Sequence, residues 1–253
     1  MKVGFLISDT LSEARLKVLN PVFNDPDFEI VVAILDKRPK LTVKQKLIRN
    51  LKKGRGGYVL VMAIERLFAK KTTSVGMLTV DLCIKHEVKV IEARNLYDQG
   101  LIEEVRNLKL ETLVLLDAFG IIKEPWLSLT PNGILSYHGG DMRKYRGQPS
   151  GLWELYNGES EMGVTVQVLA KGLDKGLPVV EKTVSIDKKD RLLDVNQKVA
   201  KVSESMLYEA LKRLSSPDFE PELINSFGKI YTLPNLRQWI MLNLKIFTRR
   251  LFN

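Results

Sequence analysis

The chain of 253 residues is poor in the residue types that most often build metal and redox sites. It contains one cysteine, Cys83, and two histidines, His86 and His138. A single cysteine cannot form an internal disulfide or a cysteine-rich structural zinc site, and the two histidines do not belong to an H-E-x-x-H motif. We therefore predict no metal centre and a reducing location, the cytoplasm.

Signals of membrane insertion and of common nucleotide sites are also missing. The longest apolar run, at residues 58–64, is too short to span a bilayer, and the N-terminus has only a short apolar stretch before Asp9. Neither a G-x-G-x-x-G nor a G-x-x-x-x-G-K-[ST] loop follows the first apolar run at residues 2–7. These absences disfavour a transmembrane segment, a secretory leader and a conventional dinucleotide or P-loop site.

The net charge of +9 is concentrated in two segments. Residues 37–71 hold 12 Lys or Arg against one acid, Glu65, and residues 229–253 hold 5 basic residues and no acid. The two segments carry +16 together, which leaves −7 for the rest of the chain. Such segments bind nucleic acid, anionic lipid or phosphorylated substrates, and a solvated helix face has the same composition. Charge alone leaves these alternatives open.

Apolar runs alternate with helical patterns along the first half of the chain, and a long amphipathic helix is predicted at 190–216. Strand patterns separated by helices predict a parallel sheet with crossover connections. We predict an α/β fold, with a mostly parallel twisted sheet flanked by helices and a small C-terminal helical appendage. The strand patterns lie at residues 2–7, 28–36, 88–93, 111–120, 132–138, 162–170 and 179–186.

Three polar residues fall at or just after the carboxyl ends of predicted strands: Asp117, His138 and Asp174. Ligands of open α/β sheets bind beyond these ends. Gly139 and Gly140 follow His138 and permit a close approach of the backbone to a ligand, although a histidine satisfied within the core is the alternative. Asp174, in "GLDKG", is typical of a turn, but beside His138 it becomes a candidate proton-handling carboxylate.

Residues 110–185 carry a series of motifs in a fixed order: His138, Tyr145-Arg146-Gly147, Trp153, Asn157-Gly158-Glu159, Gly163-Val164-Thr165 and Leu173-Asp174-Lys175-Gly176. This series resembles the core of the folate-dependent formyltransferases, which include glycinamide ribonucleotide, methionyl-tRNA and sugar N-formyltransferases. The N-terminal part resembles that family more weakly. The resemblance implies a Rossmann-like fold and transfer of a formyl group from 10-formyltetrahydrofolate to an amine.

The resemblance also implies roles for particular residues. His138 is expected to be the general base and Asp174 its electrostatic partner. Trp126 and Trp153 are predicted to anchor the core rather than to stack on a ligand. The folate pocket is expected to be shaped, largely through backbone groups, by two segments: Asp117, Ala118, Phe119 and Gly120, and Gly139, Gly140, Tyr145, Arg146 and Gly147.

One position departs from the family pattern. The family has an asparagine two residues before the histidine, and Ser136 stands there in this chain. An amide at that position donates a hydrogen bond to the oxyanion of the tetrahedral intermediate, and losing such a donor costs about 10²–10³ in rate. Ser136 is shorter, so three hypotheses follow: it is a working surrogate donor, the enzyme is slow or uses another acyl donor or acceptor, or the protein binds its ligand without catalysis.

The choice of acceptor follows from comparison within the resembling family. Methionyl-tRNA enzymes carry a second, β-rich domain, whereas the residues after 186 have helical patterns here. Glycinamide ribonucleotide enzymes have a glycine-containing phosphate loop where this chain has "LISDTLSEA". We therefore expect a nucleotide-linked amino sugar as acceptor and no tRNA domain. The competing hypothesis is a catalytically weak or inactive scaffold acting at a membrane or partner surface.

The chain divides into a predicted catalytic domain, residues 1–190 with a basic helical insertion at about 40–71, and a C-terminal helical extension, residues 191–253. The last helical pattern combines Trp239 and Phe247 with Lys245 and Arg250. That composition suits an interfacial membrane helix as well as a helix packed on the core or on a partner subunit, and we favour packing. Peripheral membrane contact through the basic helices and a homo-oligomer both stay open.

Overall fold

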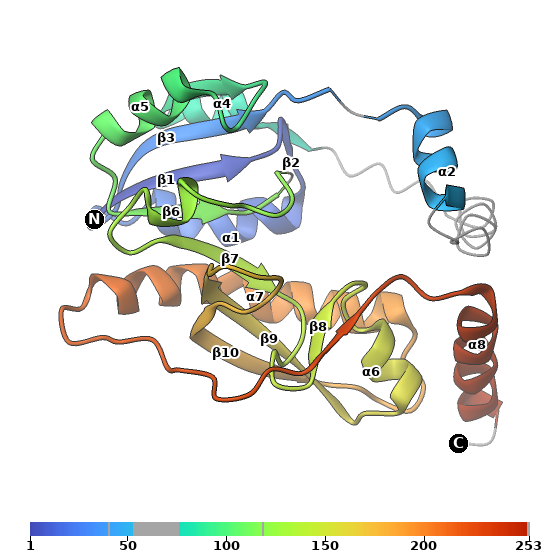
Figure 1. Ribbon diagram of the computed structural model, residues 1–253. Helices are drawn as coiled ribbons and strands as arrows, with labels where there is room; N and C mark the ends of the chain where they lie inside the picture. The colour runs from blue at the N-terminus through green and yellow to red at the C-terminus, as the bar shows by residue number, and fades with distance from the viewer. Residues whose placement is uncertain (40, 53–75, 118, 252–253) are drawn as a thin grey trace.

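A seven-stranded sheet forms the centre of the computed structural model, which describes residues 1–39, 41–52, 76–117 and 119–251 (Figure 1). The strand order is β10-β9-β7-β6-β1-β3-β5, and only β9 runs antiparallel to its neighbours. The predicted α/β fold with a mostly parallel sheet is confirmed. The strands are β1 (Lys2–Ile7), β3 (Glu29–Asp36), β5 (Lys89–Ala93), β6 (Thr112–Leu115), β7 (Ile134–His138), β9 (Glu161–Val168) and β10 (Leu177–Ser185).

Several helix ends coincide with capping residues in the local sequence. Ser12 accepts a hydrogen bond from the Arg15 N–H at the start of α1, and Asp98 accepts one from Leu101 at the start of α5. Gly158 ends α6 in the left-handed region. The helices are α1 (Glu13–Phe23), α2 (Val43–Lys52), α4 (Thr79–Lys85), α5 (Gln99–Asn107), the 3₁₀ helix η1 (Trp126–Ser128), α6 (Leu152–Asn157), α7 (Leu192–Ser215) and α8 (Leu236–Leu251).

The central strands are buried on both faces, which explains their continuous apolar runs. Phe5 of β1 packs on the face covered by α1, α4 and α7, and Leu6 packs on the opposite face, against α5 and η1. Trp126 is fully buried on the second face and donates a hydrogen bond from Nε1 to the Leu96 carbonyl at 2.6 Å. Trp153 is buried on the first face. The two tryptophans are core anchors, as predicted.

Helix α7 belongs to the same packing layer as α1. Its buried residues, among them Val195, Leu207 and Leu211, join the apolar core of the first face, and the helix contacts α1, β9 and β10. Figure 1 shows it lying along the β7–β9–β10 part of the sheet. The apolar core is continuous across residue 190, because residues on both sides of it belong to one cluster. A domain boundary at this residue stays a prediction.

The C-terminal segment also contains a strand that the sequence pattern did not indicate. β11 (Lys229–Tyr231) pairs in parallel with β8 (Tyr145–Gly147), and the short pair β2 (Thr10–Leu11) and β4 (Met77–Leu78) forms a third sheet. After β11 the chain enters α8, which packs through Leu242 and Ile246 and leaves Phe247 exposed. The favoured packing of this helix on the core is therefore present along one face.

Part of the basic insertion is visible as α2, which has no buried residue. The second predicted helix of the insertion, residues 57–71, lies outside the described residues. Within the described part of the chain, no helix combines the length and the apolarity that crossing a membrane requires.

Replacing Leu207 by alanine tests whether α7 is integral to the core. Leu207 is fully buried, so its truncation should leave a cavity and lower the free energy of unfolding by about 2–5 kcal/mol. Leu193→Ala, on an exposed position of the same helix, is the matched control. Urea unfolding followed by circular dichroism measures both. Equal, small effects of the two substitutions would show that α7 is dispensable to the fold.

Candidate active site

His138 is the last residue of β7, and its ring is 5% exposed. Nε2 lies 2.9 Å from the Tyr145 carbonyl oxygen, and Nδ1 lies 3.5 Å from Oδ1 of Asp174. A carbonyl oxygen only accepts, so Nε2 carries a hydrogen, and the carboxylate favours a second proton on Nδ1. Burial opposes the charged ring, but Asp174 and the Tyr145 carbonyl outweigh it and raise the pKa of His138. The surroundings of the ring therefore favour its charged, imidazolium form.

Asp174 reaches this ring from the loop between β9 and β10. Its backbone has φ of 46°, in the left-handed region, and its Oδ2 accepts a hydrogen bond from the Gly147 N–H at 2.7 Å. Burial alone would raise the pKa of Asp174, but His138 and the Gly147 N–H stabilise the carboxylate and lower it. The structure thus brings together the two residues that the sequence analysis singled out as a pair.

Gly139 and Gly140 leave room for this arrangement. A Cβ atom on Gly140 would lie 2.9 Å from Nε2 of His138 and 3.0 Å from the Tyr145 carbonyl oxygen. A Cβ atom on Gly139 would lie 2.1 Å from Oγ of Ser150. The packing around His138 therefore requires Gly140, and the close contact with Ser150 requires Gly139.

The side chains of Tyr145 and Arg146 fasten the loop that follows. The Tyr145 hydroxyl donates to Oε1 of Glu159 at 2.8 Å, and its ring stacks on Tyr231 with 5.1 Å between centroids. Arg146 donates from Nε to the Gly228 carbonyl at 2.8 Å and from a terminal nitrogen to the Leu173 carbonyl at 3.2 Å. Arg146 thus joins β8 both to the C-terminal segment and to the loop that carries Asp174.

The turn after β6 is anchored in a different way. Oδ1 of Asp117 accepts a hydrogen bond from Arg15 of α1 at 3.1 Å. Phe119 is buried in the core beneath the Arg38 guanidinium, and Gly120 has φ of 73°. Ala118 lies outside the described residues. A folate pocket formed by the backbone of this turn stays a prediction.

Ser136 is half-buried on the same face of β7 as His138, two residues before it. Its register partners are Leu115 on β6 and Gln167 on β9. Since side chains alternate along a strand, Ser136 lies beside His138, where a surrogate oxyanion donor would have to be.

Sequence reasoning missed Glu154, a buried carboxyl near His138. Glu154 lies in α6 and is 3% exposed, and its Oε1 has no hydrogen-bond partner. Burial raises the pKa of Glu154 to about 7, although the charge of His138 acts in the opposite direction. A Cβ atom on Gly140 would lie 3.5 Å from this oxygen. No local motif signals such a residue, because its burial results from the packing of α6 under the loop.

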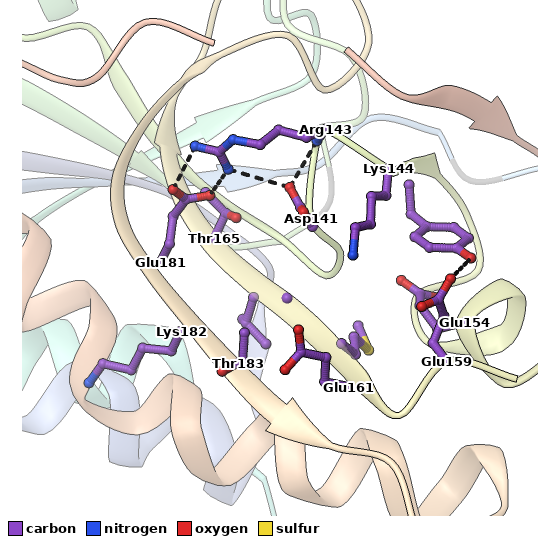
Figure 2. A pocket seen from close by; sticks show the side chains of 14 residues that line it. Asp141, Arg143, Lys144, Glu154, Glu159, Glu161, Thr165, Glu181, Lys182 and Thr183 are labelled. Atoms are coloured by element: carbon purple, nitrogen blue, oxygen red, sulfur yellow. Dashed lines mark hydrogen bonds and ion pairs between the residues drawn. The ribbon is translucent and has the colours of Figure 1, made fainter. Parts of the chain in front are cut away.

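A cavity of about 290 Å³ opens beside the same loop, on the His138 face of β9 and β10 (Figure 2). Arg143 closes one side of it by donating to Oε1 of Glu181 at 2.7 Å. Figure 2 shows Glu154 and Glu159 on the opposite side, next to each other. A second cavity, of about 340 Å³, is lined by His138, Gly139 and Ser150 together with Tyr137 and residues of α1 and α7. Among the described residues, no three His, Cys, Asp or Glu side chains are placed to hold a metal ion.

Replacing Glu154 by glutamine should make the protein less sensitive to rising pH. An unfolded chain releases the Glu154 proton near pH 4.5, but the folded chain holds it until about pH 7, so the wild type loses stability between these values. The amide does not titrate, and the advantage of the variant should reach about 3 kcal/mol above pH 7.

Urea unfolding at pH 5 and pH 8 measures this difference, with Glu161→Gln, an exposed carboxyl at the start of β9, as control. If the wild type and Glu154→Gln change in parallel with pH, Glu154 is not a buried neutral acid.

Comparison with known proteins adds to this geometry. A family model described as formyl transferase matches residues 1–211. The chain is 28% identical over 152 residues to the methionyl-tRNA formyltransferase of Pelobacter propionicus, which covers 60% of this chain and 47% of that protein. The chain spans about half the length of the curated relatives it matches.

Solved structures share the fold at low sequence identity. Glycinamide ribonucleotide transformylase 1 from Symbiobacterium toebii has a TM-score of 0.60 at 14% identity, over 88% of this chain and 94% of that chain. The N-formyltransferase from Helicobacter canadensis, in complex with folinic acid and dTDP-3-aminofucose, has a TM-score of 0.56 at 15% identity, over 91% and 70%. With the family model matched across the sheet and α1 to α6, the chain belongs to the formyl transferase family.

Proposed function

We propose that the protein is an N-formyltransferase that moves a formyl group from 10-formyltetrahydrofolate to the amine of a nucleotide-linked amino sugar. The observation that carries the proposal is the His138–Asp174 pair at the carboxyl end of β7, in a chain of the formyl transferase family. Such an end of an open α/β sheet is where ligands bind. The pair supplies a positive and a negative group at one point.

The chemistry needs both groups. When the acceptor nitrogen bonds to the formyl carbon, the carbonyl oxygen gains negative charge and the nitrogen must lose a proton. The His138 imidazolium stabilises the negative oxygen, and the Asp174 carboxylate takes the proton through a water molecule. The bond from the formyl carbon to the folate nitrogen then breaks, and that nitrogen accepts a proton.

The contacts of both ring nitrogens limit the expected role of His138 as general base. Both ring nitrogens face acceptors, so the ring must lose a proton and leave one of these partners before it can accept a proton from an amine. A general-base role for His138 stays a prediction for that deprotonated form. In the resting pair, the carboxylate is the unprotonated group.

The choice of acceptor is supported by the neighbour from Helicobacter canadensis, whose ligand dTDP-3-aminofucose is a nucleotide-linked amino sugar. The curated relatives support a second candidate, because they formylate methionyl-tRNA. A third candidate is a binding protein with weak chemistry, attached to a membrane or partner through α2 and α8. The exposed face of α8, with Leu244 51% and Phe247 59% exposed, is the feature that favours it.

Formyl transfer should depend on His138 and not on the other histidine. His138→Ala is expected to lower kcat by about 10²–10⁴, because it removes the group that balances charge in the transition state. His86→Ala is the matched control: His86 lies at the end of α4, with its ring edge-on to Phe23 at 5.0 Å.

Mass spectrometry of nucleotide-linked amino sugars and of methionyl-tRNA, each incubated with 10-formyltetrahydrofolate, measures the transfer. Formylation of tRNA alone would replace the sugar acceptor, and binding of folate without transfer to any acceptor would favour the scaffold. A His138→Ala variant with full activity would exclude the proposed site.

The pH dependence of kcat/KM should reflect the protonation of His138 and Asp174. Activity should fall at high pH as His138 loses its proton, above its ordinary pKa of 6.5, and at low pH as Asp174 gains one, below its ordinary pKa of 3.8. Asp174→Asn removes the carboxylate that raises the pKa of His138, so the high-pH limit should move to lower pH. A limit that stays in place in this variant would show that the two groups are not coupled.

A further inference from the structure

Two hydrogen-bond donors without partners face each other next to His138. Ser136 and Gln167 are register partners on β7 and β9, so their Cβ atoms lie about 4.5–5.5 Å apart. Leu135 and Val166 point into the core beneath α1 and α7, which places Ser136, Gln167 and His138 on the opposite face.

Neither donor is used within the described part of the chain. No hydrogen bond there involves Oγ of Ser136 or Nε2 of Gln167, and Gln167 is 1% exposed. Among the described residues, the buried side-chain atoms without a partner are Oδ1 of Asp9 and Oε1 of Glu154, so Nε2 of Gln167 is not sealed from solvent and is open to an acceptor that a ligand would bring.

The orientation of the Gln167 carboxamide is fixed by its oxygen. Oε1 accepts a hydrogen bond from the Gly176 N–H at 2.9 Å. The opposite assignment would bring two N–H groups together, so Nε2 must point away from Gly176. A Cβ atom at position 176 would lie 2.4 Å from Oε1 and 2.2 Å from the Val168 carbonyl oxygen, which explains why a glycine stands there.

The same contact ties Gln167 to the proposed catalytic pair. Gly176 follows Asp174 by two residues in one loop, so the hydrogen bond that orients the carboxamide also holds that loop against β9. The serine hydroxyl opposite is shorter than a carboxamide and cannot extend as far beyond the sheet.

We propose that Gln167 is the carboxamide donor to the oxyanion of formyl transfer, and that it acts from β9 beside the short Ser136 hydroxyl on β7. The inference rests on the proposed function. When the acceptor nitrogen bonds to the formyl carbon, an electron pair moves to the formyl oxygen. The Gln167 N–H hydrogen-bonds to that oxygen and keeps its proton.

Gln167→Glu separates donation from positioning. The new carboxyl retains an oxygen for the Gly176 N–H and, once ionised, has no hydrogen to donate, so at pH values where it is ionised kcat should fall by about 10²–10³ with little change in the KM for the formyl donor. Gln197→Glu, at an exposed position of α7, is the matched control and should match the wild type. Thermal unfolding confirms that each variant folds.

A rescue experiment distinguishes the donor from a merely structural residue. Ser136→Asn, in the Gln167→Glu background, places a carboxamide on the opposite strand and should restore kcat at least tenfold. A Gln167→Glu variant within threefold of the wild type overturns the proposal. So does a folded Gln167→Glu variant that Ser136→Asn does not rescue.

A spectroscopic measurement keeps this inference separate from the proposed function. In the ¹⁵N-labelled wild type, the Nε2 signals of Gln167 are assigned by their absence from the spectrum of Gln167→Glu. These signals should shift when 10-formyl-5,8-dideazafolate is added and should not shift when unformylated 5,8-dideazafolate is added. If this shift occurs but no acceptor is formylated, the proposed transfer reaction is excluded, while the assignment of Gln167 as the hydrogen-bond donor is retained. If the protein transfers formyl groups and the signals do not shift, the assignment to Gln167 is overturned alone.

Discussion

The rest of the site depends on the contact between His138 and Asp174, because it stabilises the charged form of a buried ring. A charged ring that is 5% exposed would be strongly unfavourable without partners, because little water remains to solvate it. The Tyr145 carbonyl and the Asp174 carboxylate provide those partners, one for each nitrogen. The carboxylate is itself positioned by the Gly147 N–H. The ionic state of one ring therefore depends on the backbone of β8, on both sides of Arg146.

This dependence extends to the C-terminal segment. β11 pairs with β8, and a Cβ atom on Gly147 would lie 2.0 Å from the Tyr231 carbonyl oxygen, so the two strands fit closely only with glycine there. Arg146 adds hydrogen bonds to Gly228 and Leu173. In the described structure, the side chains of Tyr145 and Arg146 and the backbone of Gly147 thus hold segments together. A part of the chain beyond the family match at residue 211 helps to shape the site.

The sequence predicted those parts of the structure that depend on local pattern. Buried parallel strands appear as continuous apolar runs, and helix caps such as Ser12 and Asp98 precede apolar periodicity, so the sheet and most helices were predictable. His138 and Asp174 were found because each follows a strand pattern, and ligands of such sheets bind at strand ends. Their identification as a pair also used the family resemblance, which local pattern alone does not supply.

The missing parts depend on contacts between distant segments. β11 is three residues long, too short for alternation to identify it, and its partner lies far away in the sequence. Glutamate side chains in helices are usually exposed to solvent, and Glu154 is buried only because of the way α6 packs. Gln167 gains its significance from the register between β7 and β9, and a shift of one residue would turn it to the other face. Register is a property of the folded sheet, so Gln167 was not among the predicted site residues.

The register argument also explains why a neutral donor suits this site. The His138–Asp174 pair already contains one positive and one negative group, and its proton balance is set by how each shifts the pKa of the other. A lysine beside the pair would lower the pKa of His138 by repulsion and disfavour its charged form. A carboxamide carries no net charge, so Gln167 can add a directed N–H without changing that balance. Its bond to Gly176 aligns it before a ligand arrives, which is the condition under which a dipole stabilises developing charge at low reorganisation cost.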